Sequence, residues 1–160
     1  MTIDDLGEYG MVRMDDEEIR AFLSSQSVGV LGLPADGAPS MRPMSFGFDG
    51  ESRLYLLYVL GSGSRKAQLS ERTEVARFLV YSAETAFNWR SVLLTGKLRK
   101  VPEDEEEAVQ NSVTMAWRPD LFRTAGEAEN TELYEFRIDE QVGIKHAGLP
   151  PGFEGDPADG

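Results

Sequence analysis

The sequence contains no cysteine and a single histidine, His146. A chain without thiols can form no disulfide, no thiolate nucleophile and no cysteine-based metal site. One imidazole likewise excludes a multi-histidine metal site within a single chain. No apolar stretch approaches the length of a membrane-spanning helix, and residues 1–5 are not typical of a signal peptide. We therefore expect one cytoplasmic domain covering residues 1–160, without a metal site.

Lysine is scarce and acidic residues are plentiful. Four of the sixteen basic residues are lysines, against twenty-eight acidic residues, and the formal net charge is −12. Such a surface repels the phosphates of nucleic acids and of anionic membranes, so neither is an expected partner. An acidic, lysine-poor composition is typical of proteins from salt-loving organisms, in which cations screen the self-repulsion. An ordinary acidic cytosolic protein has the same balance, so composition leaves both interpretations open.

Against this acidic background two adjacent cations, Arg65 and Lys66, stand out. They follow a Gly/Ser loop at residues 61–64, which comes directly after the apolar run 54–60. The run predicts a buried strand, and residues 67–72 predict one or two turns of helix. A strand, a glycine loop and a helix start favour an anion site. Glycines let backbone N–H groups approach a ligand, and the first helical turn leaves N–H donors unpaired.

The side chains of this loop fit a phosphate. Ser62 and Ser64 add hydroxyl donors, and Arg65 and Lys66 add charge-assisted ones. The alternative is a solvated turn before a helix with basic first residues, which the helix macrodipole disfavours unless an anion lies nearby. The spacing matches neither a P-loop nor the dinucleotide-binding fingerprint, because Lys66 occupies the position of the third glycine. Phosphate is therefore the predicted ligand.

The rest of the pattern predicts an antiparallel β-protein. Asp36-Gly37 and Asp49-Gly50 are typical hairpin turns between apolar or alternating runs. Several short strands with tight turns and few helices favour a closed or half-open antiparallel barrel, a mainly β (α+β) fold. We expect strands at 28–33, 38–48, 53–60, 74–81, 91–101 and 133–138 with a continuation at 142–144, helices at 15–25 and 103–116, loops at 87–89 and 117–130, a loose arm at 1–13 and a mobile tail at 147–160.

Two residues of the second expected strand are unusual for a strand interior. Pro43 cannot donate a ladder hydrogen bond, so its stretch is expected at an edge, at a bulge or facing a ligand. Arg42 beside it is either a solvated surface cation or a second contact for the anion predicted at residues 61–66. An interrupted ladder next to a phosphate loop would make a platform for a planar ring.

An ordered set of short motifs runs from about Asp16 to Val101. It consists of Val30-Leu31-Gly32, Asp36-Gly37-Ala38-Pro39, Arg42-Pro43-Met44-Ser45-Phe46, Leu54-Tyr55-Leu56, Ser64-Arg65-Lys66, Leu69, Val75 and Trp89-Arg90-Ser91-Val92-Leu93-Leu94-Thr95-Gly96. In this order the motifs resemble the pyridoxamine 5′-phosphate oxidase-like flavoproteins, and in particular the branch that includes nitroimidazole-resistance proteins. The resemblance implies an FMN-binding split barrel, which is a six-stranded antiparallel barrel with flanking helices. It also implies a homodimer with two FMN molecules at the interface.

The resemblance also implies roles for individual residues, all of them in binding the cofactor. Ser64, Arg65 and Lys66 would grip the FMN phosphate, with Arg42 as a further contact; Pro43, Met44 and Ser45 would run beside the isoalloxazine ring; Tyr58, Val59 and Ser62 would line the ribityl chain; Trp89, Arg90 and Ser91 would cover the ring from the partner subunit. The C-terminal third carries no match to the vitamin-binding residues of the oxidases, so vitamin B6 oxidation is not expected.

The leading functional hypothesis is an FMN-dependent oxidoreductase that acts on a small molecule. A non-catalytic flavin-binding or flavin-sensing protein, or a split barrel that holds a deazaflavin or haem, is the alternative. His146 is a candidate proton donor if the last strand folds over the site, and otherwise a tail residue in solvent. Residues 53–60 are apolar at nearly every position, so we expect a second copy of the chain to cover one side of this strand.

Overall fold

The computed structural model describes residues 10–59, 74–112 and 131–148, which form a seven-stranded antiparallel sheet with short helices beside it. The strands are β1 (Met11–Met14), β2 (Val28–Leu33), β3 (Ser40–Phe48), β4 (Arg53–Val59), β5 (Ala76–Thr85), β6 (Asn88–Lys100) and β7 (Thr131–Ala147). The helices are α1 (Asp16–Ser25), the 3₁₀ turn η2 (Glu103–Glu105) and α3 (Glu106–Ser112). None of the described helices is long and apolar enough to cross a membrane.

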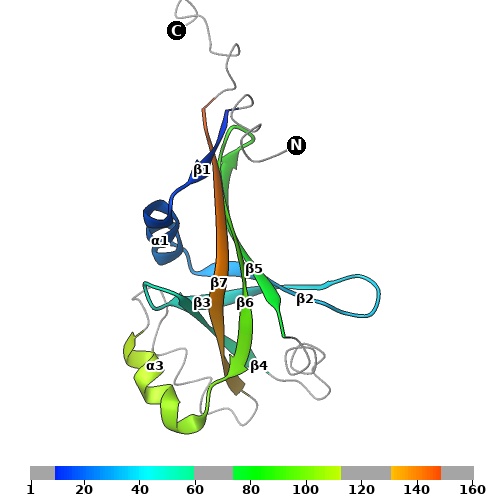
Figure 1. Cartoon of the computed structure of the whole chain (residues 1–160), viewed down its shortest axis with the longest axis vertical. Coiled ribbons are helices and arrows are strands. Elements are labelled where there is room, and N and C mark those ends of the chain that lie inside the picture. Colours follow the sequence, from blue (N-terminus) through cyan, green and yellow to red (C-terminus); the bar gives the residue numbers. More distant parts are fainter. Residues whose placement is uncertain (1–9, 60–73, 113–130, 149–160) are drawn as a thin grey trace, which may run out of the picture.

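The sheet closes on itself. Its order is β1-β7-β4-β3-β2-β5-β6, and β6 also pairs with β7, so six strands form a closed barrel with β1 added outside it. The strand β7 pairs with β6, with β4 and with β1. Figure 1 shows β6 and β7 side by side along the long axis, with α1 next to β1 and α3 towards the opposite end. The predicted six-stranded antiparallel barrel is therefore confirmed.

Local signals fix the first helix and one of the turns. The carboxylate of Asp15 accepts a hydrogen bond of 2.8 Å from the Glu18 amide and caps α1. The carboxylate of Asp49 accepts hydrogen bonds from the backbone amides of residues 51, 52 and 53, at 2.9, 3.0 and 3.1 Å. Gly50 has a φ of 90°, which a residue with a side chain rarely adopts, so the Asp-Gly sequence is required at this turn.

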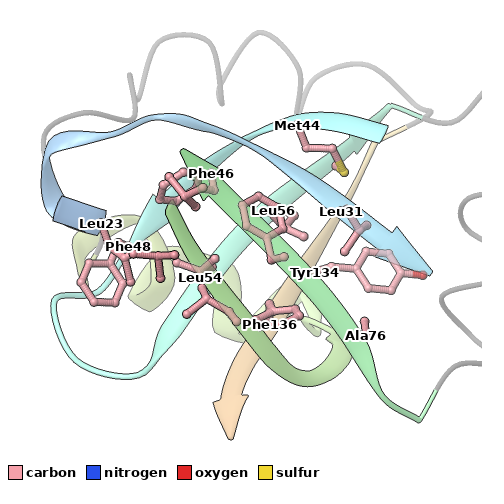
Figure 2. Packing of buried hydrophobic residues seen from close by; sticks show 14 of the residues in the cluster. Leu23, Leu31, Met44, Phe46, Phe48, Leu54, Leu56, Ala76, Tyr134 and Phe136 are labelled. Carbon is pink, nitrogen blue, oxygen red and sulfur yellow. The ribbon is translucent and has the colours of Figure 1, made fainter. Parts of the chain in front are cut away.

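The barrel interior is filled by inward-facing residues from every barrel strand, together with the apolar side of α1. Figure 2 shows part of this cluster, which includes Phe46 of β3, Leu54 and Leu56 of β4, and Phe136 of β7. The ring of Phe46 meets Phe78 edge to face, with ring centroids 5.5 Å apart. Because side chains alternate along a strand, every second residue of these strands points out of the barrel and needs water or another cover.

The outward side of β4 is covered by residues of the same chain. Tyr55, Val101, Val109 and Leu133 form a second buried cluster, and Leu57 packs against it. Val101 follows β6 and Val109 belongs to α3, so the chain that continues from β6 returns over the outside of β4 and β7. This arrangement removes the reason for expecting a second copy at this strand.

A charged network fastens the same region. One guanidinium nitrogen of Arg99 lies 3.0 Å from a carboxylate oxygen of Glu105 and 3.0 Å from one of Glu135. Glu135 is buried on β7, and Arg53 on β4 lies 3.7 Å from its other oxygen. The carboxylate of Glu135 is thus neutralised by cations from two neighbouring strands, which a buried charge requires.

Several predicted boundaries differ from those of the structure. Residues 11–13 belong to β1 and not to a loose arm, because they pair with the end of β7. Asn88 and Trp89 begin β6 and are not in a loop, since β5 extends to Thr85 and pairs with them. The predicted helix at 103–116 is the turn η2 followed by α3, and its last residues, 113–116, lie outside the described residues, as do the predicted loop at 117–130 and the tail from 149.

The last strand is longer than the predicted segments 133–138 and 142–144, which are both parts of β7. Thr95 pairs with Glu140 and Gly96 with Ile138, so Asp139 is an extra residue that forms a bulge. A Cβ atom added to Gly96 would lie 2.0 Å from the Arg137 carbonyl oxygen, so only glycine allows the approach of the two strands there. The bulge accommodates the polar interruption that the sequence pattern predicts as a break.

Candidate functional site

An opening lies between two strands of the barrel wall. β3 and β4 pair through residues 46–48 and 54–56. Beyond these pairs, residues 40–45 of β3 pair with β2, and residues 57–59 of β4 pair with β7. Within the described residues no strand therefore pairs with the β4-facing edge of residues 40–45. The backbone groups along that edge pair with no described strand, which agrees with the edge predicted at Pro43.

The side chains of the β3 half that borders this opening, residues 42–45, alternate in environment. Arg42, Pro43 and Ser45 are exposed, whereas Met44 points into the barrel and is buried. Pro43 lies opposite Val30 of β2, on the outside of the barrel, and it disturbs no pairing with β4. An exposed cation thus lies beside a proline on an edge whose backbone is not paired with β4.

Val59, the last described residue before the predicted phosphate loop, lies beside the same opening. Counting on from the Phe46–Leu56 pair, Val59 at the end of β4 is level with Pro43 of β3. Ser62, Ser64, Arg65 and Lys66 lie outside the described residues, so their contacts stay predictions. Tyr58 is fully buried and stacks on Tyr134, with ring centroids 4.2 Å apart, so its aromatic ring belongs to the core.

The third predicted group lies elsewhere in the barrel. Trp89, Arg90 and Ser91 are on β6, and β2 and β5 separate this strand from β3. Trp89 and Ser91 are half-buried, and Arg90 is exposed on the opposite face of the strand. One barrel therefore does not bring these residues together with residues 42–45 by strand pairing. That separation is compatible with the role implied by the resemblance, in which they reach the site of a partner subunit.

The barrel carries an apolar surface that sequence reasoning missed. Cross-strand pairing aligns Val30 on β2, Leu79 on β5 and Leu93 on β6, all of which point outward. A hollow of about 530 Å³ lies over this row, and its lining is almost entirely apolar. Val28, Met41 and Tyr81 extend the surface and are 54%, 63% and 57% exposed. We call Val28, Val30, Met41, Leu79, Tyr81 and Leu93 the outer apolar face. The signal in the sequence was that β2 and β5 carry apolar residues at consecutive positions, and therefore on both faces of each strand.

Of the two alternatives for His146, the tail residue in solvent is wrong. This residue lies on β7, is 5% exposed and forms a cross-strand pair with Trp89 of β6. Its Nδ1 atom lies 3.0 Å from the carbonyl oxygen of Phe87. Glycines and prolines follow it directly in the sequence, but the strand continues to Ala147 because β6 and β1 both pair with it there. The only histidine of the chain therefore sits beside a predicted cofactor-covering residue.

The sequence matches the family model described as pyridoxamine 5′-phosphate oxidase over residues 15–145. No curated protein matches the chain by sequence. The matched stretch includes the β3–β4 opening and the predicted phosphate loop.

Solved structures with similar folds come from several bacteria. A FAD-binding protein from Mesorhizobium loti has a TM-score of 0.71 at 16% identity, with 86% of this chain and 98% of that chain covered. A candidate 5-nitroimidazole antibiotic resistance protein from Bacteroides thetaiotaomicron has a TM-score of 0.66 at 16% identity, covering 84% and 87%. The flavocytochrome Anf3 from Azotobacter vinelandii has a TM-score of 0.67 at 23% identity, covering 94% and 74%. At these identities the likeness establishes the fold, which is one that flavin-binding proteins use.

Proposed function

Because this chain belongs to the pyridoxamine 5′-phosphate oxidase family, we propose that it is an FMN-dependent oxidoreductase that acts as a homodimer on a small molecule. The observation that carries the proposal is the opening between β3 and β4. There an edge of β3 free of pairing with β4, with exposed Arg42 and Pro43, lies level with Val59, the last described residue before the Gly/Ser-Arg-Lys loop of the sequence. A planar ring with a polar edge and a phosphate tail fits such a sequence of groups.

In this proposal each part of the chain has a distinct task. Ser64, Arg65 and Lys66 hold the phosphate by charge-assisted hydrogen bonds, and Arg42 adds a cation from β3. Backbone groups of residues 43–45 hold the polar edge of the ring. When bound, FMN supplies hydride and electron transfer, while the chain supplies orientation and electrostatics.

The homodimer is proposed on the outer apolar face. Large contiguous apolar patches are unusual on monomers and mark interaction sites. A second copy of the same chain is the occupant that the site needs, because one barrel separates Trp89, Arg90 and Ser91 from β3. Such an assembly buries roughly 2,000 Å² or more if the interface is obligate. Light scattering is then expected to give twice the chain mass of 17.7 kDa at micromolar concentration.

The absorbance spectrum of the purified protein is the first test. Flavin bands after addition of FMN, and a preference for FMN over FAD, support the cofactor assignment. A Soret band would instead favour haem, an alternative that gains weight because a structural neighbour is a flavocytochrome. Oxidation of NADH or NADPH with turnover of an added electron acceptor separates an oxidoreductase from a protein that merely stores or senses flavin.

The sharper test changes Arg65 and Lys66. Each charge-assisted hydrogen bond is worth about 1.5–3 kcal/mol, so replacing either residue by alanine should weaken FMN roughly 10- to 100-fold. Riboflavin lacks the phosphate and is the matched control, to be titrated at the same ionic strength. Wild type should prefer FMN, and the Arg65→Ala/Lys66→Ala variant should lose most of that preference while its riboflavin affinity barely changes. Equal weakening of both ligands would mean that the two residues support the fold or the ring instead.

A further inference from the structure

The imidazole of His146 lies in an aromatic corner at one end of the barrel. Its ring centroid is 5.7 Å from that of Phe87 and 6.0 Å from that of Trp89. Its cross-strand pairing partners are Trp89 of β6 and Met11 of β1. His146 is 5% exposed among apolar neighbours. Burying a polar group without a hydrogen-bond partner is costly, so the burial of this imidazole requires an explanation.

One nitrogen of the ring is accounted for by a backbone carbonyl. The Phe87 oxygen accepts a hydrogen bond of 3.0 Å from the Gly148 amide and lies 3.0 Å from Nδ1 of His146. A carbonyl oxygen can only accept, so Nδ1 carries a hydrogen atom. This bond fixes both the tautomer of the neutral ring and its orientation, the role that such a second partner commonly has for a working histidine.

The other nitrogen is left available. Nε2 has no hydrogen-bond partner among the described residues. No described side-chain nitrogen or oxygen is both shielded from solvent and without a partner, so Nε2 must reach the surface. The ring is thus held at Nδ1, while its Nε2 atom is in contact with solvent.

The charged groups near the ring do not satisfy Nε2. Alternation along the strands puts Arg90 of β6 and Lys145 of β7 on the opposite face of the sheet from His146. Lys145 forms an ion pair with Glu18 of α1 on that face. Arg13 of β1 lies on the same face as His146, two pairs further along, opposite Ile144. Among the described residues, no carboxylate contacts the imidazole.

We propose that His146 is the proton donor of the flavin site, acting in the site of the partner subunit to which Trp89 also contributes. The inference rests on the proposed function. The acceptor is a planar conjugated molecule that takes up a proton when it is reduced. If bound and reduced, FMN would supply the acceptor with a hydride equivalent, that is, two electrons and one proton. The protonated imidazole gives its Nε2 proton to the resulting anion, becomes neutral, and regains a proton from water.

Two substitutions separate this role from a structural one. The side-chain nitrogen of asparagine takes the position of Nδ1, so His146→Asn can keep the bond to the Phe87 carbonyl but has nothing at Nε2. The longer His146→Gln places its amide near Nε2 and loses that bond. If the bond is structural, His146→Gln should lower the melting temperature by about 2–4 °C. His146→Asn should melt close to wild type.

Activity is measured with FMN-loaded protein, NADH and two acceptors. Menadione takes up two electrons and two protons, whereas ferricyanide takes up one electron and no proton. We expect His146→Asn to lower kcat for menadione about 100-fold or more, with KM little changed, while ferricyanide reduction stays within about twofold of wild type. A variant that reduces menadione like wild type, or that loses both acceptors equally, would overturn the proposal.

A readout without turnover comes from nitrogen NMR. The chain has one histidine, so ¹⁵N-histidine labelling gives a single imidazole spectrum. Protonated Nδ1 is expected in the neutral ring, and the Nε2 resonance should move when menadione is added to FMN-loaded protein. The opposite tautomer, or an unmoved Nε2 resonance, would contradict the role. Wild-type protein that binds no flavin would overturn the proposed function and this inference together. Flavin binding with turnover and an active His146→Asn variant would overturn the inference alone.

Discussion

Two regions of the barrel wall have apolar residues on both sides, and they differ in what covers the outside. The outward residues of β4 are buried by Val109 of α3 and by Leu133, which are 7% and 1% exposed. The outward residues of β2 and β5 have no such cover among the described residues, and Val28 and Tyr81 are more than half exposed. Apolar residues on both faces of a strand therefore indicate that each face needs a cover, but they do not identify what covers it.

Placing a charge on the outer apolar face should produce the largest effect. Leu79 points outward from β5 beside the hollow, and an aspartate there would be desolvated without a partner in the proposed dimer. We expect Leu79→Asp to weaken association by at least about 1,000-fold, or ~4 kcal/mol, and to leave a folded monomer. Light scattering measures this, and circular dichroism checks the fold.

The control for this variant is Ser82→Asp, which adds the same charge to an exposed position of β5 on the opposite face. Its mass should equal that of wild type. If Leu79→Asp remains dimeric while its fold is intact, the interface lies elsewhere. A second copy of the chain would then not be what covers the outside of β2 and β5.

A cavity in the covered region should have the next largest effect, and on a different quantity. Leu133 is 1% exposed beneath α3, so Leu133→Ala should lower the free energy of unfolding by about 2–5 kcal/mol. This loss should be the same at every protein concentration. Leu93→Ala on the outer apolar face should instead cost more stability as the dimer is diluted. Urea titrations at two protein concentrations distinguish the two variants. The same concentration dependence for both would contradict the proposal that Leu133 is covered by its own chain and Leu93 by a second copy.

The smallest expected effect concerns the pH dependence of the covered region. Burial raises the pKa of the Tyr55 phenol above its ordinary value of 10.0, and the Glu135 carboxylate adds to this, while the Arg53 guanidinium opposes it. The folded chain thus holds the phenolic proton more tightly than the unfolded chain does. The corresponding stability is complete below the unfolded value near pH 10 and is lost as pH rises through the folded pKa.

Tyr55→Phe removes the titrating group. Between about pH 9 and pH 11 the variant should therefore lose less unfolding free energy than wild type does. Urea titrations across this interval give the difference directly. Parallel curves for the two proteins would mean that burial of the phenol does not shift its ionisation.

Features set by nearby residues were predictable from the sequence. The cap at Asp15 and the turn at Asp49-Gly50 depend on groups within four residues, and the structure confirms both. Features that need a distant partner were not. β1 forms because β7 extends to meet it, and β7 continues through Asp139 because β6 accommodates a bulge there. No local pattern contains that information.

The site divides in the same way. An edge, a bulge or a ligand-facing stretch was predicted at Pro43 from one residue, and the structure shows an edge, because residues 40–45 pair with β2 and not with β4. The place of His146 was missed because the Gly/Pro-rich segment after it predicts a tail, whereas its burial comes from Trp89 and Phe87, almost sixty residues away. Arg65 and Lys66, on which the phosphate prediction depends, stay sequence-based.

The position of β7 has a consequence for the order in which the molecule can assemble. This strand is the last that the structure describes, yet it separates β6 from β4 in the barrel and pairs with β1 outside it. During synthesis, β2 can pair with β3 and β5 with β6 as hairpins, but the ring of strands stays open until residues 131–147 have emerged. Because closure joins residues 53–59 of β4 to residues 131–137 of β7, it carries a large loop entropy, so folding is expected to be slow for a chain of this length. Until then the apolar faces of both hairpins remain accessible to chaperones.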